Sequence, residues 1–476
     1  MSLSRRDVLR AGPLALGLAA CGSGSAPPAG RPNILLLVSD QQRFDWVGWN
    51  TALPLRTPHL AALAARGARF DRAYCPSPLC APSRAALAAG REYHRAGVYE
   101  NLDSYPDGQA TFYASLRDAG YRVLSCGKLD LRKGRMSWGR DGQHRVGARS
   151  VFAEWGFTGG FDSSGKHDGA TGWRAGRVCP YFAFLEERGL AEIYAADMER
   201  RGFPGYEDAA PSPLPDDAYP DNWVAEHGLE LLRDAEAADE PWFLQVNFNG
   251  PHEPMDVTAS MFAAWRQVDF PQPHKNRLIP AAKNVSVRRR YAAMIENLDR
   301  HLGRFVDELA RLGATDDTLV VWTSDHGEML GDHDKWAKEV PYEPAVRVPL
   351  VCAGPGVQPG LVLTAPAATL DLAATFVELA EAVAPAGMDS RSLVPVLAAD
   401  AERTRDHVLS AMRPWTAVIE ERFKLVRGYA PEPGEGIEAV TGETLLFDLE
   451  RDPNEDRNVA AEHPDEVARL AALLPA

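Results

Sequence analysis

One cysteine stands one residue before a Pro-Ser-Arg sequence, at the predicted start of a helix. The segment SPLCAPSRAALAAGR (77–91) places Pro82 where a first helical turn accepts proline, and Gly90 follows the alanine-rich run as a stop signal. Cys80 would then lie among the unpaired N–H groups at the positive end of the helix. Such a position lowers the pKa of a thiol or receives an anion. The alternative is a buried cysteine that serves only as a small apolar residue.

Four short apolar segments end in polar residues of the kinds used in catalysis and metal binding. They are NILLLVSD (33–40), YRVLSCGKLDL (121–131), PWFLQVNFNGPHEP (241–254) and TLVVWTSDHGE (318–328). Each begins with a predicted strand, which ends at its polar cluster: Ser39–Gln41, Gly127–Lys128, Asn249–His252 and Ser324–His326. Strands that alternate with helices are typical of an α/β sheet, in which ligands bind at the carboxyl ends of the strands. We therefore predict a functional site at the edge where these four strands end.

Two metal-binding pairs follow the first and last of these strands. Asp40 and Gln41 follow the first strand, and Asp325 and His326 follow the last. Two carboxylates, an amide oxygen and an imidazole suit a hard divalent ion such as Ca²⁺, and the imidazole also admits Mn²⁺. The alternative is that Asp40 or Asp325 serves only as a cap or turn residue.

Helical patterns lie between the predicted strands. The segment TPHLAALAARG (57–67) has Thr57 as its cap, proline in its first turn and glycine as its stop. The segment 291–313 repeats apolar residues along one helix face, which predicts a buried side. Arg288, Arg289 and Arg290, just before it, are predicted to be an exposed helix start.

Together these motifs resemble those of type I sulfatases, the formylglycine-dependent members of the alkaline-phosphatase superfamily. The matching segments are CAPSR (80–84), NILLLVSDQQ (33–42), CGKLD (126–130), NGPHEP (249–254), SDHGEMLGDH (324–333) and the tail LFDLERDPNEDRNVA (446–460). The spacing is most similar to the choline-sulfatase-like branch, and GKLD resembles a branch that includes a glucuronate 2-sulfatase. The resemblance implies a large, mostly parallel α/β sheet flanked by helices, followed by a smaller C-terminal α+β domain.

The resemblance also implies that a formylglycine-generating enzyme oxidises Cys80 to formylglycine, whose hydrated aldehyde is the nucleophile. The metal beside residue 80 would be held by Asp40, Gln41, Asp325 and His326. Arg84 would steady the formylglycine and add positive charge.

The remaining implied roles concern the substrate. Lys128, His252 and Lys338 would grip the sulfate oxygens, and Asn101 would line the pocket. His94 is a second substrate-binding candidate, with a solvated histidine at a helix end as its alternative.

One residue departs from the family pattern. Many sulfatases have histidine two positions after the motif lysine, where this chain has Asp130. Three roles stay open for this carboxylate: a base that helps break down the sulfated intermediate, a contact to the sugar, or an ion pair with Lys128.

The N-terminal 21 residues are predicted to be an export signal. The Arg5–Arg6 pair resembles a twin-arginine signal, and Leu18–Cys21 resembles a lipoprotein cleavage box; a plain signal peptide is the alternative. Residues 22–30 are a predicted flexible linker, 31–400 a catalytic domain and 401–476 a C-terminal subdomain. Lipid on Cys21 would hold the protein in the periplasm or at the cell surface.

Charge and composition narrow the substrate and partner classes. The net charge of −15 argues against nucleic-acid binding. The segment from Lys128 to Arg149 contains seven basic residues and only two aspartates. This excess of positive charge suits a sulfated saccharide better than a cationic choline ester; a solvated basic surface is the alternative. We expect hydrolysis of a sulfate ester on a saccharide or small molecule. Two other functions stay open: a phosphonate monoester or phosphodiester hydrolase, and a non-catalytic, glycan-binding lipoprotein with unmodified Cys80.

Overall fold

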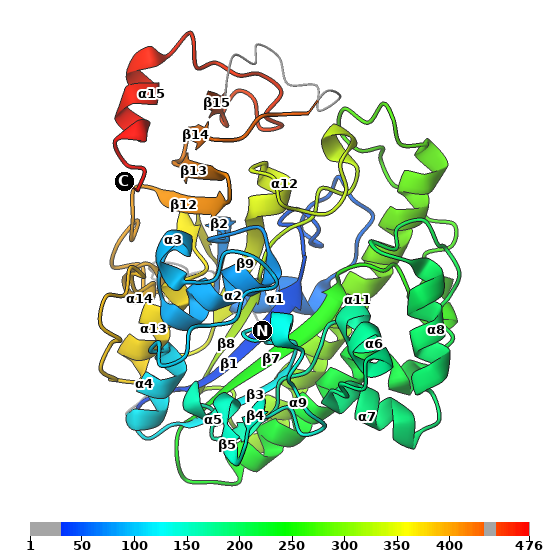
Figure 1. Ribbon diagram of the computed structural model, residues 1–476. Coiled ribbons are helices and arrows are strands. Elements are labelled where there is room, and N and C mark those ends of the chain that lie inside the picture. The colour runs from blue at the N-terminus through cyan, green and yellow to red at the C-terminus, as the bar shows by residue number, and fades with distance from the viewer. Residues whose placement is uncertain (1–29, 433–443, 476) are drawn as a thin grey trace, which may run out of the picture.

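A mostly parallel sheet forms the centre of the larger domain in the computed structural model, which describes residues 30–432 and 444–475 (Figure 1). Cys21 and the rest of the predicted export signal lie outside these residues. The strand order is β10 (Leu361–Leu363), β2 (Ala68–Tyr74), β9 (Arg347–Ala353), β8 (Thr318–Ser324), β1 (Asn33–Asp40), β7 (Trp242–Pro251), β3 (Arg122–Gly127) and β6 (Gly159–Gly160), with β11 (Ala367–Ala368) beside β2. Only β9, among the described strands of this sheet, runs antiparallel to its neighbours.

The four predicted strands are adjacent and parallel, as β8, β1, β7 and β3. Ser39 pairs with Ser324, and Asn247 pairs with both Val38 and Gly127, so the four carboxyl ends lie at one level of the sheet. Strands β3 and β8 end at Gly127 and Ser324, where the polar clusters begin, as the sequence predicts. The polar residues beyond them are therefore in loops at this edge.

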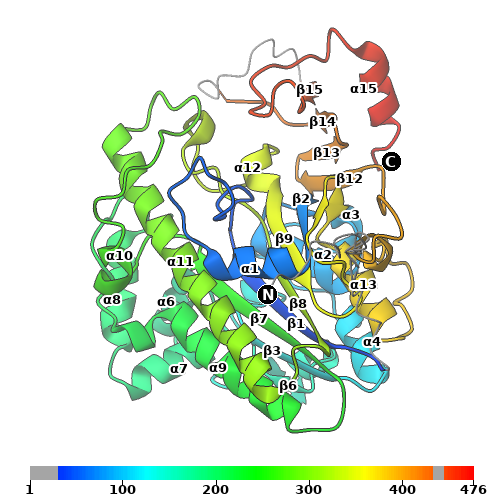
Figure 2. The ribbon, with the colours of Figure 1, turned by 180° about the vertical axis from the view of Figure 1, so that it is seen from behind.

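The apolar run of β1 is explained by burial on both faces. Ile34, Leu36 and Val38 pack in one core cluster, whereas Leu35 and Leu37 pack in the other. Helices α2 (Cys80–Ala89), α4 (Phe112–Asp118) and α13 (Asp371–Leu379) contribute to the first cluster. Helices α1 (Pro58–Arg66), α9 (Pro220–Glu236) and α11 (Ala281–Leu312) contribute to the second, and Figure 2 shows α1 and α11 in front of the sheet.

The predicted cap of α1 does not act through its hydroxyl. Thr57 precedes the helix, but its Oγ1 accepts a hydrogen bond from the Gly48 N–H at 2.6 Å. The carboxylate of Asp299, on α11, instead accepts from the N–H groups of His59 at 3.1 Å and Leu60 at 2.8 Å. A tertiary contact thus replaces the local cap, because the carboxylate satisfies two free helix N–H groups at once.

The prediction of an exposed helix start at Arg288–Arg290 is wrong. Helix α11 begins at Ala281, and Arg288 and Arg290 are both buried. The Arg288 guanidinium donates to the Pro271 carbonyl at 2.8 Å, and the Arg290 guanidinium lies over the Phe262 ring at 4.3 Å. Long aliphatic stems allow arginine to be buried where its charged end finds such partners.

The smaller C-terminal domain contains an antiparallel sheet, drawn at the top of Figure 1. Its strands are β12 (Val408–Met412), β13 (Trp415–Ile419), β14 (Phe423–Arg427) and β15 (Thr444–Asp448), and helix α15 (Pro464–Ala471) packs beside them. The buried ammonium of Lys424 bonds the Pro341 carbonyl at 2.8 Å and Glu343 at 3.0 Å. This domain therefore fixes the loop that follows Lys338.

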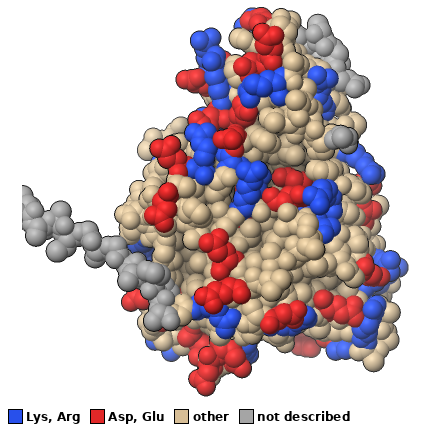
Figure 3. All heavy atoms as spheres, turned by 90° about the vertical axis from the view of Figure 1, so that its left-hand side faces the viewer, with Lys and Arg blue, Asp and Glu red and all other residues tan. Residues whose placement is uncertain are grey.

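Shorter elements connect these parts. They are α3 (Tyr93–Ala96), α5 (Val151–Glu154), α6 (Lys166–Arg174), α7 (Pro180–Glu187), α8 (Ala191–Arg201), α10 (Ala259–Ala263), α12 (Glu343–Val346), α14 (Val394–Leu397), β4 (Arg145–Val146) and β5 (Arg149–Ser150). Across the described residues, no helix combines the length and the apolar character needed to cross a bilayer. Acidic and basic side chains are interspersed on the face shown in Figure 3.

Candidate active site

Cys80 is the first residue of α2, and its buried thiol faces the carboxyl edge of the sheet. Its Sγ lies 3.2 Å from Nε2 of His326, 3.6 Å from Nζ of Lys128 and 3.6 Å from Nζ of Lys338. The Asp40 carboxylate is 3.9 Å away. The structure thus brings residues from four separate segments around one sulfur atom.

The electrostatic surroundings of Cys80 differ from those of an ordinary core cysteine. Burial and the Asp40 charge raise the pKa of the Cys80 thiol. Lys128, Lys338 and His326 lower it by a larger amount, so the net shift is downward. Cys75 is equally buried, and burial raises the pKa of its thiol. The environment of Cys80 favours an anion, whereas that of Cys75 favours a neutral thiol.

The predicted metal ligands converge beside this sulfur. One ligand atom from each of Asp40, Cys80, Asp325 and His326 lies within 4.8 Å of the others, and all four residues are buried. Nδ1 of His326 is 3.0 Å from the Gly327 carbonyl, which can only accept, so Nδ1 carries the hydrogen. Nε2 is then free to bind an ion, and this donor set fits a divalent metal.

The Gln41 amide is oriented by two carboxylates that sequence reasoning did not single out. Gln41 has φ +67°, its Nε2 donates to Glu253 at 2.6 Å and also to Glu328, and its Oε1 accepts from Lys338. Burial and the neighbouring Glu253 raise the pKa of Glu328 to about 7. Both glutamates lie inside the quoted motifs, Glu253 next to His252 and Glu328 two residues after His326. This position in the sequence was the one sign that they belong to the site.

Arg84 joins the two carboxylates predicted to bind the metal. Its buried guanidinium lies 3.0 Å from Oδ2 of Asp40 and 2.9 Å from Oδ2 of Asp325. Burial raises the pKa of Asp40, but the positive charges of Lys128, His252 and Arg84 lower it by a larger amount. The carboxyl therefore stays ionised. Lys128 adds a direct ion pair to Asp40 at 2.5 Å.

His252 and Lys338 form a hydrogen-bonded pair on the other side of the thiol. His252 Nδ1 lies 2.6 Å from the Glu253 carbonyl, and Nε2 lies 2.8 Å from Lys338 Nζ. Burial and the Lys338 charge hold the pKa of His252 well below its usual value. Burial lowers the pKa of Lys338, but Cys80, Glu253 and Asp40 raise it to a greater extent.

Asp130 lies behind the lysine rather than on an open surface. It is fully buried, and its carboxylate is 3.5 Å from Nζ of both Lys128 and Lys133. Burial raises its pKa, yet these two lysines lower it by more. Of the three roles left open by the sequence, the geometry favours the ion pair.

A cavity of about 340 Å³ opens above the cluster. Lys128, His252 and Lys338 line it, together with Asn101, whose Oδ1 accepts from the Ala81 N–H at 3.0 Å. The structure does not bring His94 to this wall, because its side chain is exposed on α3. The cavity is also lined by Lys133, Lys166, His167, Asp168 and Phe203, which the sequence analysis did not name individually.

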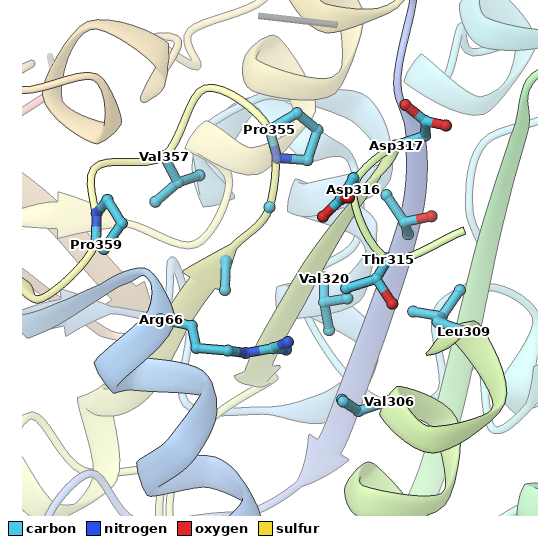
Figure 4. Close-up of a pocket in the computed structure, with 13 residues that line it drawn as sticks. Arg66, Val306, Leu309, Thr315, Asp316, Asp317, Val320, Pro355, Val357 and Pro359 are labelled. Carbon is cyan, nitrogen blue, oxygen red and sulfur yellow. The ribbon is translucent and has the colours of Figure 1, made fainter. Parts of the chain in front are cut away.

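A second cavity, of about 520 Å³, lies at the opposite edge of the sheet (Figure 4). Arg66, Asp316 and Asp317 line it, near the start of β8 and the end of β9. None of the residues around Cys80 takes part. The predicted catalytic and metal-binding residues therefore lie at the cavity on the carboxyl edge, not at this one.

Comparison with known proteins decides the family. Residues 32–382 match the family model described as "Sulfatase". The chain belongs to the sulfatase family. A second model, "N-sulphoglucosamine sulphohydrolase, C-terminal", matches residues 331–473 of this sulfatase. The type I family predicted from the motifs is confirmed, and the protein is a sulfuric ester hydrolase.

Relatives and solved structures agree with this assignment. The sulfatase is 32% identical to the choline-sulfatase of Rhizobium meliloti, over 90% of this chain and 83% of the relative. It is 25% identical to the N-acetylglucosamine-6-O-sulfatase of Bacteroides thetaiotaomicron, over 97% and 88% respectively. A phosphonate monoester hydrolase of Agrobacterium radiobacter has a similar structure, with TM-score 0.74, 23% identity and coverage of 93% and 94%. The predicted fold class is confirmed.

Proposed function

We propose that this sulfatase hydrolyses the sulfate ester of a saccharide, using a formylglycine made from Cys80 and a bound divalent metal. The observation that carries the proposal is the position of Cys80 at the start of α2, between two lysines, a histidine and the acidic ends of β1 and β8. Positive charge preorganised around one atom stabilises the transfer of an anionic group.

Asp40, Gln41, Asp325 and His326 are the residues proposed to hold the metal, with Ca²⁺ as the expected ion and Mn²⁺ as an alternative. When bound, such an ion withdraws electron density from oxygen atoms beside it and offsets negative charge. Arg84 holds Asp40 and Asp325 side by side, because its guanidinium bonds both carboxylates.

The proposed reaction has two stages. Asp325 accepts the proton of one hydroxyl of the hydrated aldehyde at position 80, the oxygen of that hydroxyl attacks sulfur, and the bond from sulfur to the ester oxygen breaks. Lys338 or His252 supplies a proton to the departing alcohol, and Lys128 and Arg84 offset the charge on the sulfate oxygens. The second hydroxyl then gives its proton to the Lys338 or His252 group that protonated the alcohol, the carbon–oxygen bond to sulfate breaks, and the aldehyde is restored as sulfate leaves. Addition of water to the aldehyde re-forms the hydrate.

A saccharide is the proposed substrate because of the relatives and the cavity wall. One relative is named as an N-acetylglucosamine-6-O-sulfatase. On the cavity wall here, four lysines (Lys128, Lys133, Lys166 and Lys338) outnumber three acidic residues (Asp168, Glu253 and Glu339). Such a wall disfavours a cationic choline ester. Arg135, Arg140, Arg145 and Arg149 are exposed, so most of the basic stretch is a solvated surface.

Export is proposed from the sequence alone, through the signal at residues 1–21 and lipid on Cys21, with residues 31–400 and 401–476 as the two domains. A formylglycine-generating enzyme is the expected partner before or during export. A periplasmic or surface location would expose the enzyme to extracellular sulfated glycans.

The test compares 4-nitrophenyl sulfate with 4-nitrophenyl phosphate and a phenylphosphonate monoester, after co-expression with a formylglycine-generating enzyme. We expect kcat/KM to be highest for the sulfate, and Cys80→Ala to abolish turnover while leaving the Tm near that of the unsubstituted protein. The phosphonate alternative, suggested by the solved structure above, requires the opposite order. Sugar binding without any turnover would identify the glycan-binding alternative.

A further inference from the structure

The cationic groups on the cavity wall already have partners. Lys133 lies 2.9 Å from the Asp168 carboxylate. Lys166 donates to Asp256 at 2.7 Å and to the carbonyls of His252 at 3.0 Å and Pro254 at 3.2 Å. An ammonium group has three hydrogens, so Lys166 has none left for a ligand.

Two other polar atoms on the same wall have no partner among the described residues. They are Oδ1 of Asn249 and Nε2 of His167, and both atoms are shielded from solvent. Asn249 is only 6% exposed overall, so solvent reaches its amide poorly. Buried polar atoms are normally paired, and an unpaired one in a binding cavity marks a position for a ligand group.

The backbone holds Asn249 in place. The N–H groups of Asn249 and Gly250 both donate to Oδ1 of Asp221, at 2.6 and 3.0 Å. The Asn249 amide therefore projects from a fixed point at the end of β7, three residues before His252. Asn249 and His252 thus line the same cavity.

His167 lies beside the apolar mouth of the cavity. Its ring meets the edge of Phe203 with centroids 5.5 Å apart, and Phe203 and Leu102 are 77% and 76% exposed. Both apolar side chains line the cavity. A pyranose ring, with an apolar face and polar edges, matches a wall that combines exposed carbon with unpaired polar atoms.

We propose that Asn249 and His167 are specificity-determining residues that hydrogen-bond hydroxyl groups on the alcohol half of the substrate. This inference rests on the proposed function and deepens it. A hydroxyl both donates and accepts, so it satisfies either end of the amide and either form of the imidazole. Choline sulfate and simple aryl sulfates carry no free hydroxyl for these atoms, and sites built to hydrogen-bond a hydroxyl reject analogues that lack it.

The experiment measures kcat/KM of the formylglycine-containing enzyme on 4-nitrophenyl sulfate and on a panel of sulfated monosaccharides. The panel contains the 6-sulfates of glucosamine, N-acetylglucosamine, galactose and glucose and the 2-sulfate of glucuronate. Asn249→Ala should lower kcat/KM for the best saccharide by roughly 10- to 100-fold and change that for the aryl ester by less than about threefold. His167→Phe should also lower the ratio of kcat/KM for the saccharide to kcat/KM for the aryl ester.

Asn284→Ala is the matched control, because Asn284 is also a buried asparagine whose Oδ1 has no partner in the described part of the chain, but it does not line the cavity. It should leave the saccharide-to-aryl ratio unchanged. Equal losses on both substrates in Asn249→Ala would overturn the inference, as would aryl turnover with no saccharide turnover at all. Absence of turnover on every sulfate ester would instead overturn the proposed function, and the inference with it.

Discussion

The ammonium group of Lys338 donates a hydrogen bond to Nε2 of His252 over 2.8 Å, while Nδ1 of the same ring donates to the Glu253 carbonyl at 2.6 Å. Both ring nitrogens are thus engaged in the neutral form of the imidazole. The pair therefore holds its mobile proton on Lys338, 3.6 Å from the Cys80 sulfur. The proposed proton donor to the leaving alcohol is already charged before substrate binds.

Removing this donor should harm poor leaving groups most. Lys338→Ala should lower kcat for a sulfated saccharide by about 10²- to 10⁴-fold. The loss should be much smaller for 4-nitrophenyl sulfate, whose leaving oxygen needs no proton. A series of aryl sulfates with graded leaving-group acidity would measure this as a steeper dependence of kcat on that acidity.

Lys335→Ala is the control for that series, because it is the same change three residues away, at a lysine paired with Glu432. It should leave the slope unaltered. A uniform loss across all leaving groups in Lys338→Ala would show that Lys338 only binds sulfate.

Asp130 is expected to position Lys128 rather than to transfer protons. Asp130→Asn should reduce kcat by less than about tenfold, because Asp40 still holds Lys128, and should cost about 1–3 kcal/mol in the free energy of unfolding. Steady-state kinetics across pH and urea unfolding would measure both. A base would behave differently: kcat would fall by about 10²- to 10⁴-fold and the acidic limb of the pH profile would disappear.

The strand ends and the cysteine could be predicted because they are local patterns. The apolar run before Asp40 and the polar residues after it are both visible along the chain. The partners of Gln41 were not visible in the same way, since Glu253, Glu328 and Tyr206 come from three distant segments.

Errors in the sequence predictions have the same origin. Thr57 is a good local cap, yet the carboxylate that caps α1 is 240 residues away in the sequence, on α11. Arg288 and Arg290 were expected on the surface because charge is usually exposed, and carbonyl and aromatic partners from other segments bury them. Side-chain placement on the cavity wall likewise depends on tertiary packing.

Metal removal should stop catalysis without unfolding the protein. Arg84 bridges Asp40 and Asp325, so their mutual repulsion is already offset. Calcium at about 100 times its Kd should stabilise the fold by roughly 2.7 kcal/mol, seen as a rise in Tm with calcium concentration. Asp325→Asn should reduce the rise in Tm with calcium. If neither activity nor Tm changes on chelation or on addition of calcium, the proposed metal site is contradicted.

Glu92 should make stability depend on pH. Burial raises its pKa from 4.5 to about 7, against the opposing charge of Arg405. A folded-state pKa above the unfolded value gives stability that is complete below pH about 4.5 and is lost as the pH rises through about 7. From pH 5 to 8 this carboxyl should cost about 2–3 kcal/mol, at 1.36 kcal/mol for each pKa unit.

Urea unfolding of the unsubstituted protein and Glu92→Gln at several pH values would measure that loss. Glutamine keeps the shape and cannot ionise, so the variant should show a flatter dependence of unfolding free energy on pH. Parallel curves for the two proteins would show that Glu92 does not carry the effect.

The most direct test is mass spectrometry of the tryptic peptide 73–84, from protein co-expressed with a formylglycine-generating enzyme. This peptide contains both Cys75 and Cys80, and Cys75 serves as an internal control. We predict that sulfur and two hydrogens are exchanged for one oxygen at position 80 alone, and that the modified fraction tracks sulfatase activity. An intact thiol at position 80 in fully active enzyme would contradict the account.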